Sequence, residues 1–145
     1  MSYMCESNTP SDFTLGQMMV PDPVCVTKET SLAGAIGILD KKGFDQLPVV
    51  FDHESKHLAG ALTSRQVAIW AKDWASVSGA TVGEAMQTPW EGLKGNPQDR
   101  MSDELLGYFS TYDFMVVVDD QKRVIGIVQL WDVARKLWNA HTSGS

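Results

Sequence analysis

The sequence predicts a mixed α/β (α+β) protein built from two similar halves, and three observations support this fold class. The run TLGQMM at residues 14–19 returns 67 positions later as TVGEAM at residues 81–86. Each half then carries two short β-rich runs separated by a charged turn, and helical patterns lie on both sides of this hairpin. Two such halves of about 65 residues are each marginal alone, so they are expected to share one core.

In the first half, the order is short strand, helix, strand, strand, helix. Thr30 or Ser31 can cap a helix that stops at Gly43. The hairpin consists of residues 47–51, a turn at 52–57 and residues 58–62, and a second helix is expected over residues 64–75. The apolar positions expected on the two helices are Leu32, Ala35, Ile36 and Leu39 on the first, and Val67, Trp70 and Trp74 on the second.

The second half repeats this order. Asp99 or Ser102 can cap a helix, the hairpin runs through residues 115–118, 119–123 and 124–128, and a last helix is expected over residues 131–139. The apolar positions are Met101, Leu105, Tyr108 and Phe109 on the first helix, and Val133, Ala134, Leu137 and Trp138 on the last. We therefore expect a flexible leader at 1–12, repeats at 13–80 and 81–139, and a flexible tail at 140–145.

Composition and charge exclude several functional classes. Of the 145 residues, 43% are hydrophobic, which predicts a globular core. Twelve basic against eighteen acidic residues give a net charge of −6, which disfavours nucleic acid and anionic membranes as partners. With no apolar span and two cysteines, Cys5 and Cys25, expected as free thiols, the sequence predicts a soluble, cytoplasmic protein.

Motifs for catalysis are absent from the sequence. There is no G-x-S-x-G, P-loop, G-x-G-x-x-G or C-x-x-C pattern. His53, Glu54 and His57 share one turn, but two solvated histidines without a cysteine are more typical of a polar turn than of a metal site. We expect a protein that is not an enzyme, with no catalytic residues and no bound metal.

Three duplicated signals resemble the tandem CBS-domain pair (Bateman module). They are the G-x-x-M opening at Gly16 and Gly83, the LPVV-type strand before an acidic turn, and the G-h-h-T-x-x-D-type entry into the last helix of each half. The run KGFDQLPVV at residues 42–50 also resembles the C-terminal regulatory region of cystathionine β-synthase. The resemblance implies two pseudo-symmetric repeats packed sheet to sheet, with adenosyl ligands in the clefts between them.

The resemblance also implies which residues contact such a ligand. Asp132 takes the place of the carboxylate that accepts hydrogen bonds from the ribose hydroxyls. Asp45 could face the positive charge of S-adenosylmethionine, whereas a polyphosphate would require Lys41, Lys42 or Arg135 nearby. The full expected set is Val24, Cys25, Val26, Phe44, Asp45, Gln46, Leu47, Gln129, Trp131 and Asp132, and a second, degenerate site comprises Thr63, Gln66, Asp113 and Phe114.

Simpler structural roles remain open for two of these residues. Asp132 is also an ordinary acid for the first turn of a helix, and Phe44 is an ordinary core aromatic. Each half keeps only part of T-x-x-D, with Gln66 in place of the first acid and Gln129 in place of the second threonine.

The expected function is that of a regulatory module that senses an adenosyl compound, S-adenosylmethionine above all, or AMP or ATP, without another cofactor. Its other expected partners are a second copy of the chain and a catalytic domain or partner enzyme of the cystathionine β-synthase kind. The helices at 64–75 and 131–139, which carry Trp70, Trp74, Trp131 and Trp138, would form a homodimer interface. The alternative is a ligand-free CBS-pair scaffold for dimerisation.

Overall fold

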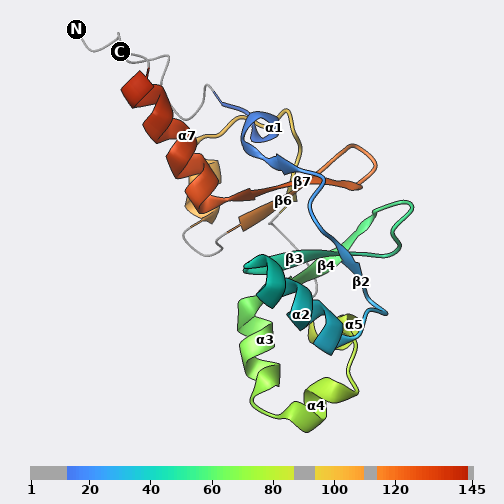
Figure 1. Ribbon diagram of the computed structural model, residues 1–145. Helices are drawn as coiled ribbons and strands as arrows, with labels where there is room; N and C mark the ends of the chain where they lie inside the picture. Colours follow the sequence, from blue (N-terminus) through green and yellow to red (C-terminus); the bar gives the residue numbers. More distant parts are fainter. Residues whose placement is uncertain (1–12, 87–93, 110–113, 144–145) are drawn as a thin grey trace, which may run out of the picture. The chain divides into compact units, whose positions relative to one another are not determined.

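A computed structural model describes residues 13–86, 94–109 and 114–143, and its mixture of helices and two sheets confirms the α/β fold class (Figure 1). The chain forms two compact units. One consists of Met1–Asp22, Gly92–Asp120 and Ile125–Ser145, and the other of Pro23–Glu91 and Gln121–Val124. We call them the four-stranded unit and the three-stranded unit after their sheets. The predicted leader at 1–12 and Cys5 lie outside the described residues.

The sheet of the three-stranded unit contains the first predicted hairpin. Strands β2 (Val26–Thr27), β3 (Gln46–Val50) and β4 (Leu58–Thr63) lie in the order β2-β3-β4. β2 is parallel to β3, and β3 is antiparallel to β4. The register pairs Gln46 with Thr63, so the start of β3 and the end of β4 are neighbours.

Helix α2 (Leu32–Lys42) begins and ends as predicted. The Ser31 hydroxyl accepts a hydrogen bond from the Gly34 N–H at 3.1 Å, and Gly43 ends the helix in the left-handed conformation, with φ 70°. Leu32, Ala35 and Leu39 turn toward the core of the unit. This core also contains Val26, Leu47, Val49, Leu62, Val77, Ala80, Val82 and Ala85.

The single helix predicted over residues 64–75 is wrong, because two helices occupy this stretch. α3 (Ser64–Ala71) ends at Lys72, and α4 (Trp74–Ser78) begins after Asp73. Asp73 starts the new helix by accepting a hydrogen bond from the Ala75 N–H at 3.1 Å. An aspartate with extended backbone is a favoured N-cap, which explains the break. A short α5 (Val82–Ala85) follows.

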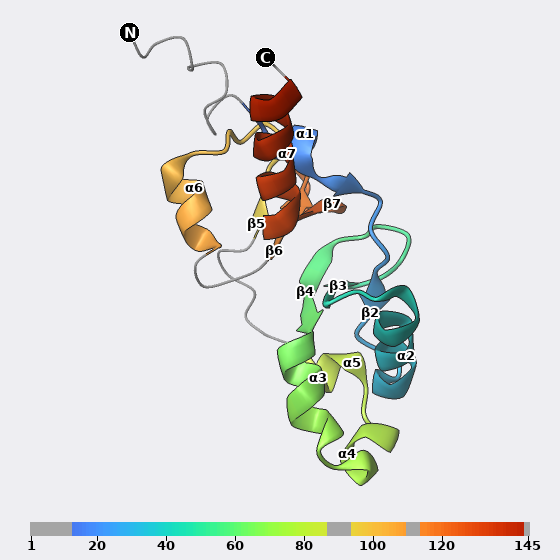
Figure 2. The ribbon, with the colours of Figure 1, turned by 60° about the vertical axis from the view of Figure 1, so that its left-hand side comes forward.

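The four-stranded unit has the sheet order β1-β7-β6-β5, formed by β1 (Val20–Pro21), β5 (Lys94–Gly95), β6 (Phe114–Val118) and β7 (Val124–Gln129). Its helices are α1 (Leu15–Met18), α6 (Asp103–Tyr108) and α7 (Leu130–Ser143), shown in Figure 2. The core is rich in methionine and consists of Leu15, Met18, Met101, Phe109, Met115, Val117, Val128 and Val133.

Of the two caps predicted for α6, Ser102 is the one observed, and the Asp99 carboxylate instead accepts a hydrogen bond from the Asn96 N–H at 2.9 Å. Met101 and Phe109 are buried as expected but flank the helix rather than lie within it. α7 continues to Ser143, which is four residues beyond the predicted end at Asn139.

The two similar segments at residues 14–19 and 81–86, which we call the repeated leaders, each dock onto a loop that precedes a helix of the other sequence repeat. In the four-stranded unit, the Leu15 N–H donates to the Asp99 carbonyl at 2.8 Å, next to α6. In the three-stranded unit, the Val82 N–H donates to the Thr30 carbonyl at 2.8 Å, next to α2. The compact units therefore differ from the repeats at 13–80 and 81–139, which describe the sequence alone.

The tip of the second hairpin belongs to the three-stranded unit. There the Leu58 N–H donates to the Lys122 carbonyl at 3.0 Å, and the Val124 N–H donates to the Lys56 carbonyl at 2.8 Å. Both lysines have a left-handed backbone, with φ 58° at Lys56 and 64° at Lys122. The two turns, although different in length, thus share a left-handed lysine two residues before the second strand of each hairpin.

Candidate functional site

The residues predicted to contact a ligand are divided between the two units. The three-stranded unit contains Thr63, Gln66 and the segments at 24–26 and 44–47. The four-stranded unit contains Phe114, which is buried, together with Gln129, Trp131 and Asp132. Asp113 lies outside the described residues. The residues of each unit are therefore described separately.

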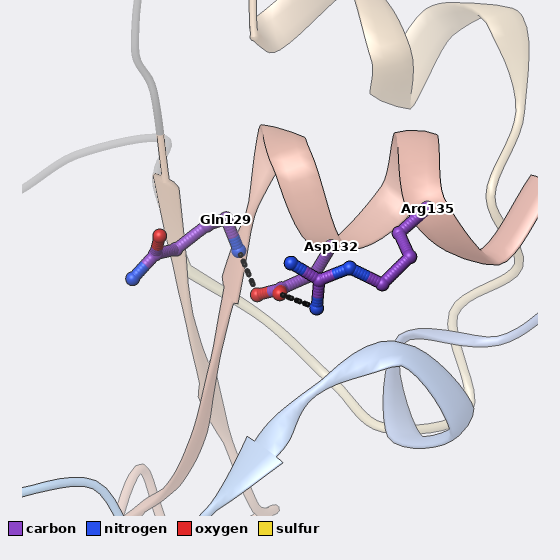
Figure 3. A network of polar contacts seen from close by, with 3 residues as sticks. All are labelled: Gln129, Asp132 and Arg135. Carbon is purple, nitrogen blue, oxygen red and sulfur yellow. Dashed lines mark hydrogen bonds and ion pairs between the residues drawn. The ribbon is translucent and has the colours of Figure 1, made fainter.

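Asp132 lies in the first turn of α7, and its carboxylate has two neighbours (Figure 3). Oδ2 accepts a hydrogen bond from the Gln129 N–H at 3.1 Å, and Oδ1 lies 3.7 Å from Nη1 of Arg135. An acid at the third helical position satisfies a backbone donor at the helix start and interacts favourably with the helix dipole. Asp132 thus has the helix-capping role that the sequence left open. A carboxylate has about four acceptor sites, so this role leaves capacity for further donors.

Arg135 completes this small polar network. Its guanidinium lies 5.6 Å from the centroid of the Trp131 ring, which suits a cation–π contact four residues apart on one helix face. The Trp131 side chain is exposed. From the sequence, Arg135 was expected only as one of three cations that a polyphosphate would require nearby, although its spacing of three from Asp132 on a helix was the signal that could have placed it.

The first half contains the equivalent arrangement at the start of α3. The Thr63 N–H donates to Oε1 of Gln66 at 2.9 Å, and the Thr63 hydroxyl donates to the same oxygen. Gln66 therefore caps α3 in the same way that Asp132 caps α7, because each side chain accepts the backbone N–H of the residue three positions earlier. The difference is chemical, because a neutral amide here replaces a charged carboxylate.

Phe44 and Asp45 connect α2 to β3 and have different surroundings. Phe44 is half-buried and packs against the core of its unit, in line with the structural alternative for this aromatic. Asp45 is exposed, and its carbonyl accepts a hydrogen bond from the Ser64 N–H at 2.9 Å. Because Gln46 pairs with Thr63 in the sheet, the structure joins two groups of residues that the sequence had assigned to separate sites.

Gln46 and Leu47 are both buried, whereas the residues of the 24–26 segment differ in their exposure. Val26 is buried and pairs with Val49 in the sheet, whereas Val24 is partly exposed. Cys25 Sγ donates to the Pro23 carbonyl at 3.4 Å. Burial raises the pKa of the Cys25 thiol to about 11, although the positive charge of Lys56 acts in the opposite direction.

Within residues 13–86, 94–109 and 114–143, no three His, Cys, Asp or Glu side chains are grouped closely enough to hold a metal ion. His53, Glu54 and His57 are exposed in their turn. In the same part of the chain, no helix combines the length and apolar character needed to cross a membrane.

Comparisons with known proteins agree on one family. A model of the CBS domain matches residues 15–72. Over 50 residues, the chain is 42% identical to a cystathionine beta-synthase from Dictyostelium discoideum, and this match covers 34% of the chain but only 10% of that relative. The chain therefore spans a small part of the curated relative that it matches.

Solved structures with the same fold are CBS-pair proteins. One is CBSX2 from Arabidopsis thaliana, in a complex with AMP, with a TM-score of 0.75, 23% identity, and coverage of 89% of this chain and 98% of the other. Another is the CBS domain pair of protein MJ0100, in a complex with 5-methylthioadenosine and S-adenosyl-L-methionine. Its TM-score is 0.71 at 25% identity, covering 87% of this chain and 96% of the other.

Proposed function

Because the chain contains a CBS domain and has the fold of CBS-domain pairs, we propose that it is a non-catalytic regulatory module that binds an adenosyl compound. The observation that carries this proposal is the Asp132 carboxylate at the start of α7, where the family resemblance expects the acceptor for ribose. Two proteins of the same fold were solved with adenosyl ligands, which supports this class of ligand.

Asp132 is suited to ribose because a carboxylate is an acceptor-only group with several lone pairs. The Gln129 N–H and Arg135 each occupy one side of it, and the ribose hydroxyls would donate to the remaining positions. We assign the other contacts to Gln129, Trp131, and the segments at 24–26 and 44–47. The exposed Asp45 carboxylate would attract the positive charge of S-adenosylmethionine, and the ranking of this ligand against AMP or ATP depends on how that attraction balances against the cation Arg135 beside Asp132.

Regulation would follow from differential affinity. A ligand that binds one arrangement of the module better than another shifts the population toward that arrangement. The partner that responds would be a catalytic domain or separate enzyme of the cystathionine β-synthase kind, in keeping with the partial match to that enzyme.

Isothermal titration of S-adenosylmethionine, AMP and ATP tests the proposal, first on the unaltered chain and then on Asp132→Asn. Asparagine can still accept the Gln129 N–H through its side-chain oxygen, so the helix cap is kept while the charge is removed. We expect affinity to fall about tenfold or more, because hydrogen bonds to a charged acceptor are worth about 1.5–3 kcal/mol. Asp103→Asn, an exposed acid in the first turn of α6, is the control. Equal affinity in Asp132→Asn would remove Asp132 from the site.

A second candidate function is a dimerisation scaffold, and exposed tryptophans favour it. On α7, Trp131 and Trp138 are 64% and 67% exposed and lie seven residues apart, so they share one helix face. Large aromatics are enriched at protein interfaces, and we propose a second copy of the chain as the partner. Light scattering tests this: a dimer that becomes a monomer in Trp138→Glu supports it, whereas a monomer at micromolar concentration of the unaltered chain contradicts it.

A further inference from the structure

We infer that Arg135 determines ligand specificity and favours adenosyl ligands that carry a phosphate over uncharged or cationic ones. The inference rests on the proposed function and goes beyond it by naming the charge of the ligand. Its basis is the network of Figure 3, in which one cation lies beside the carboxylate that would hold the ribose.

The geometry leaves the Arg135 guanidinium accessible. Nη1 lies 3.7 Å from Oδ1 of Asp132, which is longer than the 2.7–2.9 Å of a strong charge-assisted hydrogen bond. The Arg135 side chain is 55% exposed, whereas that of Asp132 is 19% exposed. The guanidinium is thus the more accessible of the two charged groups, and a pair with so exposed a partner is weak enough for a ligand to replace.

Two neighbours keep the guanidinium near this position. Asp132 attracts it, and the exposed ring of Trp131, 5.6 Å away, offers a cation–π contact. Trp131, Asp132 and Arg135 all lie in the first two turns of α7, so one helix holds the three side chains near one another. A ligand that occupies Asp132 therefore meets a held positive charge.

This charge discriminates among adenosyl compounds. Guanidinium carries five donors in a planar fork that matches the oxygens of a phosphate, so AMP gains contacts that adenosine lacks. The sulfonium and ammonium groups of S-adenosylmethionine gain nothing from Arg135 and are repelled by it. The phosphate-bearing ligand is thus favoured at the Asp132 end of the site.

The experiment measures dissociation constants for adenosine, AMP and S-adenosylmethionine on the unaltered chain and on three variants. Arg135→Gln removes the cation, Arg135→Lys keeps the charge without the fork, and Lys136→Gln removes the neighbouring exposed cation of α7 as the matched control. Thermal unfolding without ligand checks that each variant is folded.

On the unaltered chain, we expect AMP to bind roughly fivefold to tenfold more tightly than adenosine, and more tightly than S-adenosylmethionine. In Arg135→Gln the ratio of AMP to adenosine affinity should fall to about one, with a much larger loss for AMP than any change for adenosine, because the lost contact is to the phosphate. Arg135→Lys should retain part of the ratio and Lys136→Gln all of it. Added salt should lower the ratio in the unaltered chain but not in Arg135→Gln.

The outcomes separate this inference from the proposed function. If AMP and adenosine bind equally, if Arg135→Gln keeps the full ratio, or if S-adenosylmethionine binds more tightly than AMP, the module still binds adenosyl compounds but the role of Arg135 is wrong. If no adenosyl compound binds, the proposed function fails and this inference fails with it.

Discussion

The backbone N–H of Gly83 donates a hydrogen bond to the carbonyl oxygen of Lys28 at 2.9 Å, and a Cβ added to Gly83 would lie only 3.2 Å from the same oxygen. The first leader repeats this relationship. The Gly16 N–H donates to the Pro97 carbonyl at 2.9 Å, where an added Cβ would lie 3.1 Å from the oxygen. In both copies of the repeated leader, the absence of a side chain on glycine therefore allows two backbone segments to lie close together.

Replacing Gly83 by alanine is expected to lower the free energy of unfolding by about 1–2 kcal/mol, because backbone atoms must shift to admit the methyl group. Gly37→Ala is the matched control. Gly37 lies within α2 and has no atom within 4 Å of an added Cβ, so this change should raise the free energy of unfolding by about 0.5–1 kcal/mol. Urea denaturation measures both. A neutral Gly83→Ala would show that the leader tolerates a wider approach.

The two leaders also show how far the sequence alone could predict the fold. Similarity between residues 14–19 and 81–86 indicated that the order of elements repeats, and the hairpins and α2 were predicted from local patterns. The docking of each leader beside a helix of the other repeat was not, because self-similarity identifies equivalent segments but not the segments they contact. The break at Asp73 was missed because the apolar residues continue at helical spacing across it. In the folded chain, the Asp73 side chain caps a new helix there despite this spacing.

The candidate site was predicted in part, for a similar reason. The position of Asp132 follows from the motif at the end of β7, and a plain role as an acid in the first helical turn was the stated alternative, whereas its contact with the Gln129 N–H was not predicted. The contact with Arg135 depends on side-chain rotamers at an exposed helix face, which spacing permits but does not fix. Whether the groups of the two units form one ligand site stays a prediction.

The helix break separates the roles of two tryptophans that the sequence placed on one face. Trp70 lies in α3, is half-buried and packs against the core, whereas Trp74 lies in α4 and is 69% exposed. Trp70→Ala should therefore cost about 2–3 kcal/mol of unfolding free energy and Trp74→Ala less than about 0.5 kcal/mol. Urea denaturation of the two variants compares them directly. Equal losses would contradict the two-helix arrangement.

Gln129→Thr is expected to stabilise α7. Threonine is a favoured residue immediately before a helix, and Asp132 already accepts the backbone N–H of position 129, so the change would complete a reciprocal pair of capping bonds. We expect the free energy of unfolding to rise by about 0.5–1 kcal/mol, measured by thermal unfolding without ligand. The converse change, Thr63→Gln at the equivalent position of α3, should lower it. A loss of stability in Gln129→Thr would show that the longer amide has a packing role.

Cys25 makes the stability of the three-stranded unit depend on alkaline pH. Burial raises the pKa of its thiol to about 11 from an ordinary value near 9.0, so the folded chain favours the protonated form. The contribution of this thiol to stability is therefore fully present below pH 9 and is lost as the pH rises from about 9 to 11. In Cys25→Ala this part of the pH dependence should disappear, which urea denaturation across that range would measure.

Alkylation of the thiol gives a more direct measurement. In a Cys5→Ser background, the reaction of Cys25 with iodoacetamide should be slow at pH 8 and should rise with an apparent pKa of about 11, because only the thiolate reacts. In urea, the same chain should react with the ordinary pKa near 9.0, since unfolding removes the burial that raises it. A folded chain that titrates at or below pH 9 would mean that water reaches Cys25 freely or that the Lys56 charge outweighs the effect of burial.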